Sequence, residues 1–146
     1  MRRSVFGLAG ASALFLTAAG GSDPAKVRQH GAVLFENRCA RCHGINADGD
    51  GGLGPSLIGV LGRPAASRSD FLYSAALKAK GGNWTPEVLD RYLADPQAFA
   101  PGADMDVPSP DPDERAAIIA YLKTLKAGAD LASAGDKESG TRGNQR

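Results

Sequence analysis

The stretch Cys39-Ala40-Arg41-Cys42-His43 decides how this 146-residue chain must fold. The two cysteines lie about one helical turn apart, so both thiols can add to the two vinyl groups of a haem. The imidazole of His43 follows directly and can bind the haem iron. We therefore expect the rest of the chain to wrap around one covalently attached haem.

Other interpretations of the cysteine pair have less support. A tetrahedral zinc site needs four Cys or His ligands, but the chain has 2 cysteines and its only other histidine is His30. A thiol-disulfide oxidoreductase normally carries its pair at a strand-to-helix junction, and no strand-like alternation occurs here. A structural disulfide and a chance match stay open as alternatives.

Length and composition point to one domain with a modest core. The formal net charge is +1 and no basic run tracks a phosphate backbone, which argues against nucleic-acid binding. Glycine and proline are plentiful, with 19 and 9 residues, and they argue against a coiled coil. A bound cofactor would supply the missing core.

Residues 1–22 are typical of a signal peptide. Arg2 and Arg3 form a positive start, residues 5–16 an uncharged apolar stretch, and residues 17–22 a cleavage zone of small side chains. We expect export to the periplasm. A retained membrane anchor that faces the periplasm is the alternative.

The remaining pattern predicts one helical domain over residues 23–127 and a disordered tail over residues 128–146. Apolar spacing, caps and prolines predict short helices without strands. The expected helices cover residues 23–39, 71–80, 85–94 and a last segment that starts at Asp111. Residues 55–64 are apolar but broken by glycine and proline, which indicates an irregular wall beside a cofactor.

Met105 is the only methionine besides the initiator. It lies in a proline-bounded polar loop, residues 101–108, where a core methionine is not expected. A thioether bound to iron opposite His43 would favour the reduced state and leave no position open for a substrate. We therefore expect no enzyme activity. If Met105 were displaced, a small-ligand sensor or enzyme would be the alternative, with His30 a weaker candidate ligand.

Further motifs follow the cysteine pair in a characteristic order. They are Gly54-Pro55-Ser56-Leu57, Gly62-Arg63, Trp84-Thr85-Pro86, Tyr92-Leu93 and Pro101-Gly102, followed by Met105. In this order and spacing the chain resembles the class I cytochromes c, in particular the soluble carriers of mitochondria and bacteria, over about residues 25–126. The resemblance implies an all-α fold of short helices and long loops around one haem c, with His43 and Met105 as the metal ligands.

The resemblance also implies roles for individual residues. The carbonyl of Pro55 would accept the proton of the non-ligating nitrogen of His43, and the hydroxyl of Tyr92 would point at the sulfur of Met105. The side chains that would hydrogen-bond the inner haem propionate are Arg63, Tyr73 and Trp84.

The same resemblance implies that the first and last helices cross closely. Gly31 and Phe35 would pack against Ile118 and Tyr121. The glycine would allow close approach because it has no side chain.

The function implied is single-electron transfer between redox proteins that dock transiently. We expect a monomer, and peripheral association with membrane complexes is compatible with this function. A cytochrome subunit dedicated to a periplasmic dehydrogenase fits the sequence nearly as well. Asp104 and Asp106 flank Met105, whereas Arg38, Arg41 and Lys80 are basic, so we expect a docking face of mixed sign.

Overall fold

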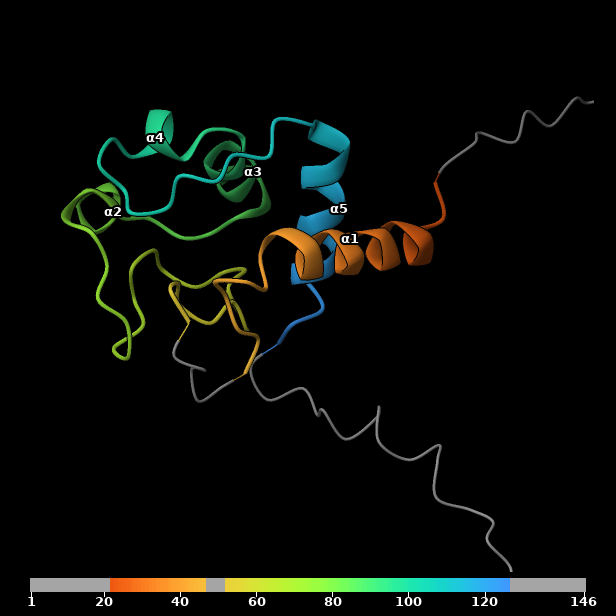
Figure 1. Ribbon diagram of the computed structural model, residues 1–146, viewed down its shortest axis with the longest axis horizontal. Helices are drawn as coiled ribbons and strands as arrows, with labels where there is room; N and C mark the ends of the chain where they lie inside the picture. Colours follow the sequence, from red (N-terminus) through yellow and green to blue (C-terminus); the bar gives the residue numbers. More distant parts are fainter. Residues whose placement is uncertain (1–21, 47–51, 127–146) are drawn as a thin grey trace, which may run out of the picture.

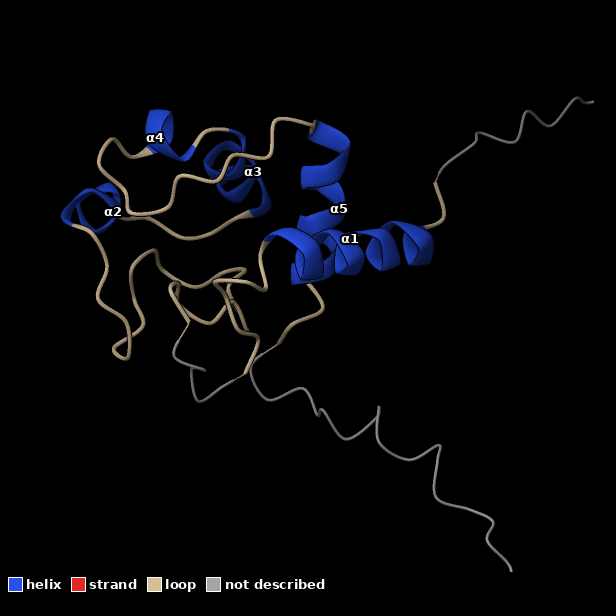
Figure 2. Cartoon of the chain, viewed as in Figure 1, coloured by secondary structure: helices blue, strands red, loops and turns tan. Residues whose placement is uncertain are grey.

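The computed structural model describes residues 22–46 and 52–126. Within these residues it contains five helices and no strand, apart from an isolated bridge between Pro64 and Asn83 (Figures 1 and 2). The predicted all-α class is therefore confirmed. The signal segment up to residue 21 and the tail from residue 127 lie outside the described residues.

Helices α1 (Pro24–Arg38) and α5 (Pro112–Leu122) cross at one side of the molecule (Figure 1). A Cβ at Gly31 would come within 1.9 Å of the Ala117 carbonyl oxygen and 3.0 Å of the Tyr121 Cβ, so only glycine allows this approach. The Phe35 and Tyr121 rings pack with centroids 5.3 Å apart. The expected crossing is confirmed, with Ala117 as the nearest neighbour of the glycine.

The other helices are α2 (Ala75–Lys80), α3 (Pro86–Ala94) and α4 (Pro96–Phe99). In Figure 1, α1 and α5 form one side of the molecule, and α2, α3 and α4 form the other. Three aromatic side chains join α3 and α4 to the loop before them, with the Trp84 and Tyr92 centroids 5.1 Å apart and those of Tyr92 and Phe99 5.4 Å apart.

Four of the five helices begin in the same way. A side chain that accepts a hydrogen bond from the first turn precedes a proline at the first helical position, which needs no backbone donor. The capping residues are Asp23, Thr85, Asp95 and Asp111. This local signal explains why the starts of α1, α3 and α5 were predictable.

The structure differs from the prediction at the start of α2 and in one additional helix, α4. Helix α2 begins at Ala75 rather than residue 71, because the hydroxyl of Ser74 caps it by accepting from the Leu77 N–H at 3.3 Å. The short helix α4 follows the predicted helix of residues 85–94 and was not expected. In the structure Asp95 also caps the next helix through the Ala98 N–H at 2.9 Å.

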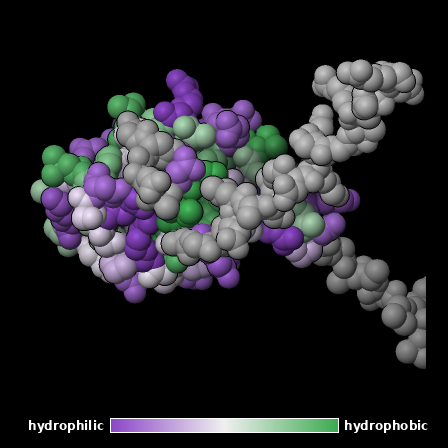
Figure 3. Space-filling model, turned by 90° about the horizontal axis from the view of Figure 1, so that it is seen from below, coloured by the Kyte–Doolittle hydropathy of each residue, from purple (hydrophilic) through white to green (hydrophobic). Residues whose placement is uncertain are grey.

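Within the described residues, no helix is both long enough and apolar enough to cross a membrane. Hydrophilic side chains cover much of the described surface, with hydrophobic side chains visible between them on the face shown in Figure 3.

Candidate functional site

A cavity of ≈ 310 Å³ opens between the α1–α5 pair and the loops that carry α2, α3 and α4. This volume lies in the range of roughly 300–1,000 Å³ that is typical of cofactor sites. Its lining is largely apolar. All nine residues proposed from the sequence as site residues lie at or beside it: Cys39, Cys42, His43, Pro55, Arg63, Tyr73, Trp84, Tyr92 and Met105.

The end of α1 brings the two cysteines to the cavity. The helix ends at Arg38, and the amide of His43 donates to the Cys39 carbonyl at 2.9 Å, so one further turn presents Cys39, Cys42 and His43 together. Both thiols are free rather than joined in a disulfide. Burial raises the pKa of the Cys39 thiol, although the nearby Arg38 partly opposes this effect.

The ring of His43 is held in a fixed orientation. Its Nδ1 lies 2.8 Å from the carbonyl oxygen of Pro55. Because a carbonyl can only accept, Nδ1 carries the proton and donates, which leaves Nε2 of the neutral ring with a free lone pair. The expected Pro55 contact is therefore present in the structure.

Gly54 packs directly on this imidazole. A Cβ at residue 54 would lie 2.4 Å from Cε1 and 2.6 Å from Nδ1 of His43, well inside van der Waals contact. Gly54 belongs to a motif that the sequence analysis names, but no contact with His43 was predicted for it. Its position directly before Pro55 was the available signal.

Another part of the cavity wall carries a partly buried cation, Arg63. The Arg63 guanidinium donates to the Ile58 carbonyl at 2.9 Å and to the Ser56 carbonyl at 3.2 Å. Burial lowers the pKa of Arg63, and burial also raises the pKa of Tyr73. The Trp84 indole lines the same region, where its main chain is tied to that of Arg63 by a 3.0 Å hydrogen bond.

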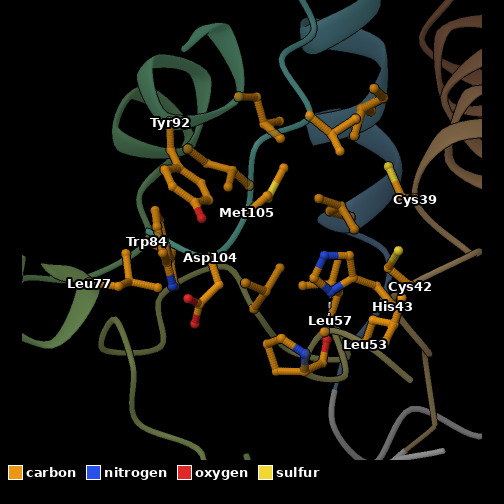
Figure 4. A pocket seen from close by; sticks show the side chains of 18 of the residues that line it. Cys39, Cys42, His43, Leu53, Leu57, Leu77, Trp84, Tyr92, Asp104 and Met105 are labelled. Atoms are coloured by element: carbon orange, nitrogen blue, oxygen red, sulfur yellow. Dashed lines mark hydrogen bonds between the residues drawn. The ribbon is translucent and has the colours of Figure 1, made fainter. Parts of the chain in front are cut away.

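Met105 enters the cavity from the loop after α4. Figure 4 shows its side chain pointing into the space between the Cys39, Cys42 and His43 cluster and the side formed by Tyr92 and Trp84. Burial, and to a lesser extent the charge of Asp104, raise the pKa of Tyr92 to about 12. The tyrosine hydroxyl therefore keeps its proton at neutral pH and is available as a donor.

The two remaining residues, His30 and Asp104, lie in different places. His30 is exposed on α1 and does not line the cavity, so the structure does not bring it to the other site residues. Asp104, expected only as a charged neighbour of Met105, lines the cavity as well and is labelled beside Trp84 in Figure 4. This place at the cavity wall depends on the path of the loop, which no local pattern predicts.

The residues fit a covalently attached haem. Two thiols one turn apart and an imidazole with a free Nε2 face a largely apolar cavity. The Arg63 guanidinium has no carboxylate hydrogen-bond partner within the described residues, so it can bind a propionate. A zinc site does not fit, since no group of three His, Cys, Asp or Glu side chains gathers within the described part of the chain.

Comparison with known proteins agrees with this geometry. The cytochrome c family model matches residues 29–126. Cytochrome c2 of Rhodopila globiformis is 44% identical over 107 residues, which cover 73% of this chain and 100% of that protein. Cytochrome c of Nigella damascena is 37% identical over 71% of this chain and 95% of its own length.

A longer relative, the c-type cytochrome cyt cy of Rhodobacter capsulatus, is 46% identical over 107 residues. The match covers 70% of this chain but 53% of that relative, so the chain spans about half the length of cyt cy. On the family match and on the full-length similarity to cytochrome c2, the chain belongs to the cytochrome c family, with one covalent haem c as its cofactor.

Proposed function

We propose that this chain carries single electrons between redox proteins in the periplasm, with its haem iron held by His43 and Met105. The observation that carries the proposal is the meeting of both thiols, the oriented imidazole and the thioether in one cavity. When bound, the haem supplies the one-electron change between ferric and ferrous iron. The chain supplies the ligands, their orientation and an environment that excludes water.

His43 binds iron through Nε2. The Pro55 carbonyl accepts the proton of Nδ1, which fixes the tautomer and makes Nε2 a stronger ligand for the iron. Gly54 packs on this ring, where a Cβ would collide with it.

Met105 would supply the second protein ligand of the iron. A thioether favours ferrous iron and raises the potential, which suits an electron carrier. Tyr92, whose hydroxyl keeps its proton, would donate toward the Met105 sulfur. With the iron bound by both His43 and Met105, no position would remain for a substrate, so we propose that the protein is not an enzyme.

Arg63, Tyr73 and Trp84 hold the inner propionate. Burial disfavours the charge on Arg63, and a carboxylate beside it offsets that cost. Two carbonyl acceptors hold the Arg63 guanidinium in a fixed orientation, so the protein itself forms this part of the propionate site.

The rim of the cavity is the proposed docking face. Leu53 and Val107 line the cavity and are 86% and 56% exposed, so they offer apolar contact to a partner. Arg38 pairs with Glu114 at 2.6 Å, and Lys80 lies over the Phe99 ring at 4.4 Å from its centroid. Two of the three expected basic points are thus engaged within the chain, which favours a face of mixed sign and a small, transient contact.

Residues 1–22 act as the export signal in this proposal, and residues 23–127 form the mature cytochrome domain with the tail of residues 128–146 behind it. Export fits the relationship to bacterial cytochrome c2, and attachment of haem to both thiols would then occur outside the cytoplasm.

The test is expression of the full chain in a bacterial host that attaches haem c, followed by cell fractionation and redox titration. We expect covalent haem in the periplasmic fraction, a one-electron titration and a ferrous form that resists carbon monoxide. Haem that stays with the cytoplasmic fraction would contradict export. Rapid carbon monoxide binding by the wild-type protein would contradict the closed ligation and favour a small-ligand sensor.

A further inference from the structure

We propose that Gln97 is a positioning residue that holds the Met105 loop closed and so sets how readily the Met105 sulfur leaves the iron. This inference rests on the proposed ligation by Met105. It assigns the control of that bond to a neutral side chain in α4 that does not line the cavity.

The Gln97 amide is bonded at both ends to the main chain of the loop. Its Oε1 accepts from the Gly102 N–H at 3.1 Å. Its Nε2 donates to the carbonyl oxygens of Ala103 at 2.8 Å and of Met105 at 3.1 Å. Since an N–H only donates and a carbonyl only accepts, these partners also fix which end of the amide is which. Glutamine can make this set of bonds because it offers one acceptor and two donor hydrogens.

The helix that carries Gln97 is itself fixed. Asp95 accepts from the Ala98 N–H at 2.9 Å, and Pro96 is one of the most completely buried residues of the described chain. The glutamine side chain therefore extends toward the loop from a firm base, although α4 has only 4 residues.

Other supports of the loop lie farther from the sulfur-bearing residue. Before Met105, a turn closes with the Ala103 N–H donating to Ala100 at 2.9 Å, and Gly102 supplies the positive φ of 89° that this turn needs. After Met105, the next main-chain hydrogen bond among the described residues joins the Ser109 N–H to Leu93 at 2.7 Å. The bond from Gln97 to the Met105 carbonyl is thus the one closest to the ligand.

Release of the thioether requires the main chain around residue 105 to move away from α4. That movement breaks the two bonds that Gln97 donates. Without them the open form of the loop is more populated, and an external ligand reaches ferric iron more often.

The experiment measures cyanide binding to the ferric holoprotein for wild type and for Gln97→Ala, Gln97→Glu and Met105→Ala. Gln97→Glu keeps the side-chain length and the acceptor for Gly102 but loses both donated bonds, so it separates the hydrogen bonds from packing. Asp23→Ala is the control, because it removes the cap of α1 and lowers stability far from the loop.

We expect both Gln97 variants to bind cyanide roughly tenfold faster than wild type, in line with the loss of two hydrogen bonds. They should keep the weak far-red sulfur-to-iron band, while Asp23→Ala binds at the wild-type rate. Wild-type rates in both Gln97 variants, with the far-red band present and fast binding by Met105→Ala, would overturn the role of Gln97 alone. Equal acceleration by Asp23→Ala would also overturn it, since the rate would then follow global stability.

A wild-type protein that lacks the far-red band and binds cyanide as fast as Met105→Ala would overturn the ligation as well as the clamp. The proposed function and the role of Gln97 therefore fail in different ways.

Discussion

His43 and Met105 line the same cavity, but the chain holds them by different means. His43 follows a helix end directly, donates to a main-chain carbonyl and packs on Gly54, where a single methyl group would collide with the ring. Met105 lies in a loop that is exposed directly after it, and a glutamine from another helix holds its main chain. A hydrogen bond and steric contact together fix His43, the first proposed ligand, whereas hydrogen bonds from Gln97 hold the main chain of Met105, the second. We therefore expect ligand exchange to begin on the methionine side.

The largest effect should follow from breaking the His43 side at its covalent base. Cys39→Ser combined with Cys42→Ser removes both thiols that can add to the haem vinyl groups, so we expect complete loss of covalent haem. The measurement is haem staining after denaturing electrophoresis, with Met105→Ala as the control that keeps both thiols. Staining that persists in the double variant would show that the attachment assignment is wrong.

Removal of the proposed methionine ligand should free one coordination position of the iron without loss of the haem. Met105→Ala leaves both thiols and His43 in place, so the covalent haem should remain while the ferrous protein binds carbon monoxide rapidly. Stopped-flow mixing with carbon monoxide checks this, with wild type as the resistant reference. Equal resistance of Met105→Ala and wild type would mean that another group fills the position.

A pair of glycine variants compares the two sides directly. Gly54→Ala places a Cβ 2.4 Å from Cε1 of His43, so the ring or the main chain must shift, and we expect a loss of about 1–3 kcal/mol in the free energy of unfolding. Gly102→Ala meets nothing closer than the Ala76 Cβ at 3.8 Å, but its φ of 89° costs about 1–2 kcal/mol of backbone strain.

The two glycine variants should also differ in the signal that they change. Denaturant unfolding of the two holoproteins gives the stabilities, and the far-red band reports on the sulfur. Gly102→Ala should weaken that band, whereas Gly54→Ala should leave it and shift the potential through the imidazole. The reverse assignment of these signals would break the comparison.

The smallest effect should appear in docking. Asp104 and Asp106 are exposed near the ligand, and Arg38 is engaged by Glu114, so salt should change the rate of electron transfer to the native partner only modestly. Salt at 0.1 M screens exposed charges beyond about 10 Å, which makes a salt series the direct measurement. A steep fall with salt that disappears in Arg38→Gln combined with Arg41→Gln would reveal a dominant basic face instead.

Much of this fold could be predicted because its signals are local. A cap followed by proline marks the starts of α1, α3 and α5, and the closely spaced cysteines and histidine specify the attachment site without reference to distant residues. The residues expected to bind the haem propionate, and the tyrosine expected beside the Met105 sulfur, came from resemblance to a family. The structure places them around one cavity.

The features that were missed depend on the path of the folded chain, which local patterns in the sequence do not show. Arg38 and Glu114 lie 76 positions apart in the sequence, so their pairing exists only after α1 and α5 have crossed. The bonds from Gln97 to the Met105 loop depend on the direction in which α4 leaves Asp95, which no periodic pattern encodes. Helix α4 was missed because four residues are too few to show helical spacing.

The partners of Gln97 are all main-chain atoms, and this has a consequence for how such a protein can change over generations. The exposed side chains of Asp104 and Asp106 can be exchanged without the loss of any bond that Gln97 makes. Selection can therefore alter the charge that a partner meets while the ligand stays in place. An engineer has the same freedom: Asp104→Lys with Asp106→Lys would favour an acidic partner and leave the three bonds of Gln97 in place.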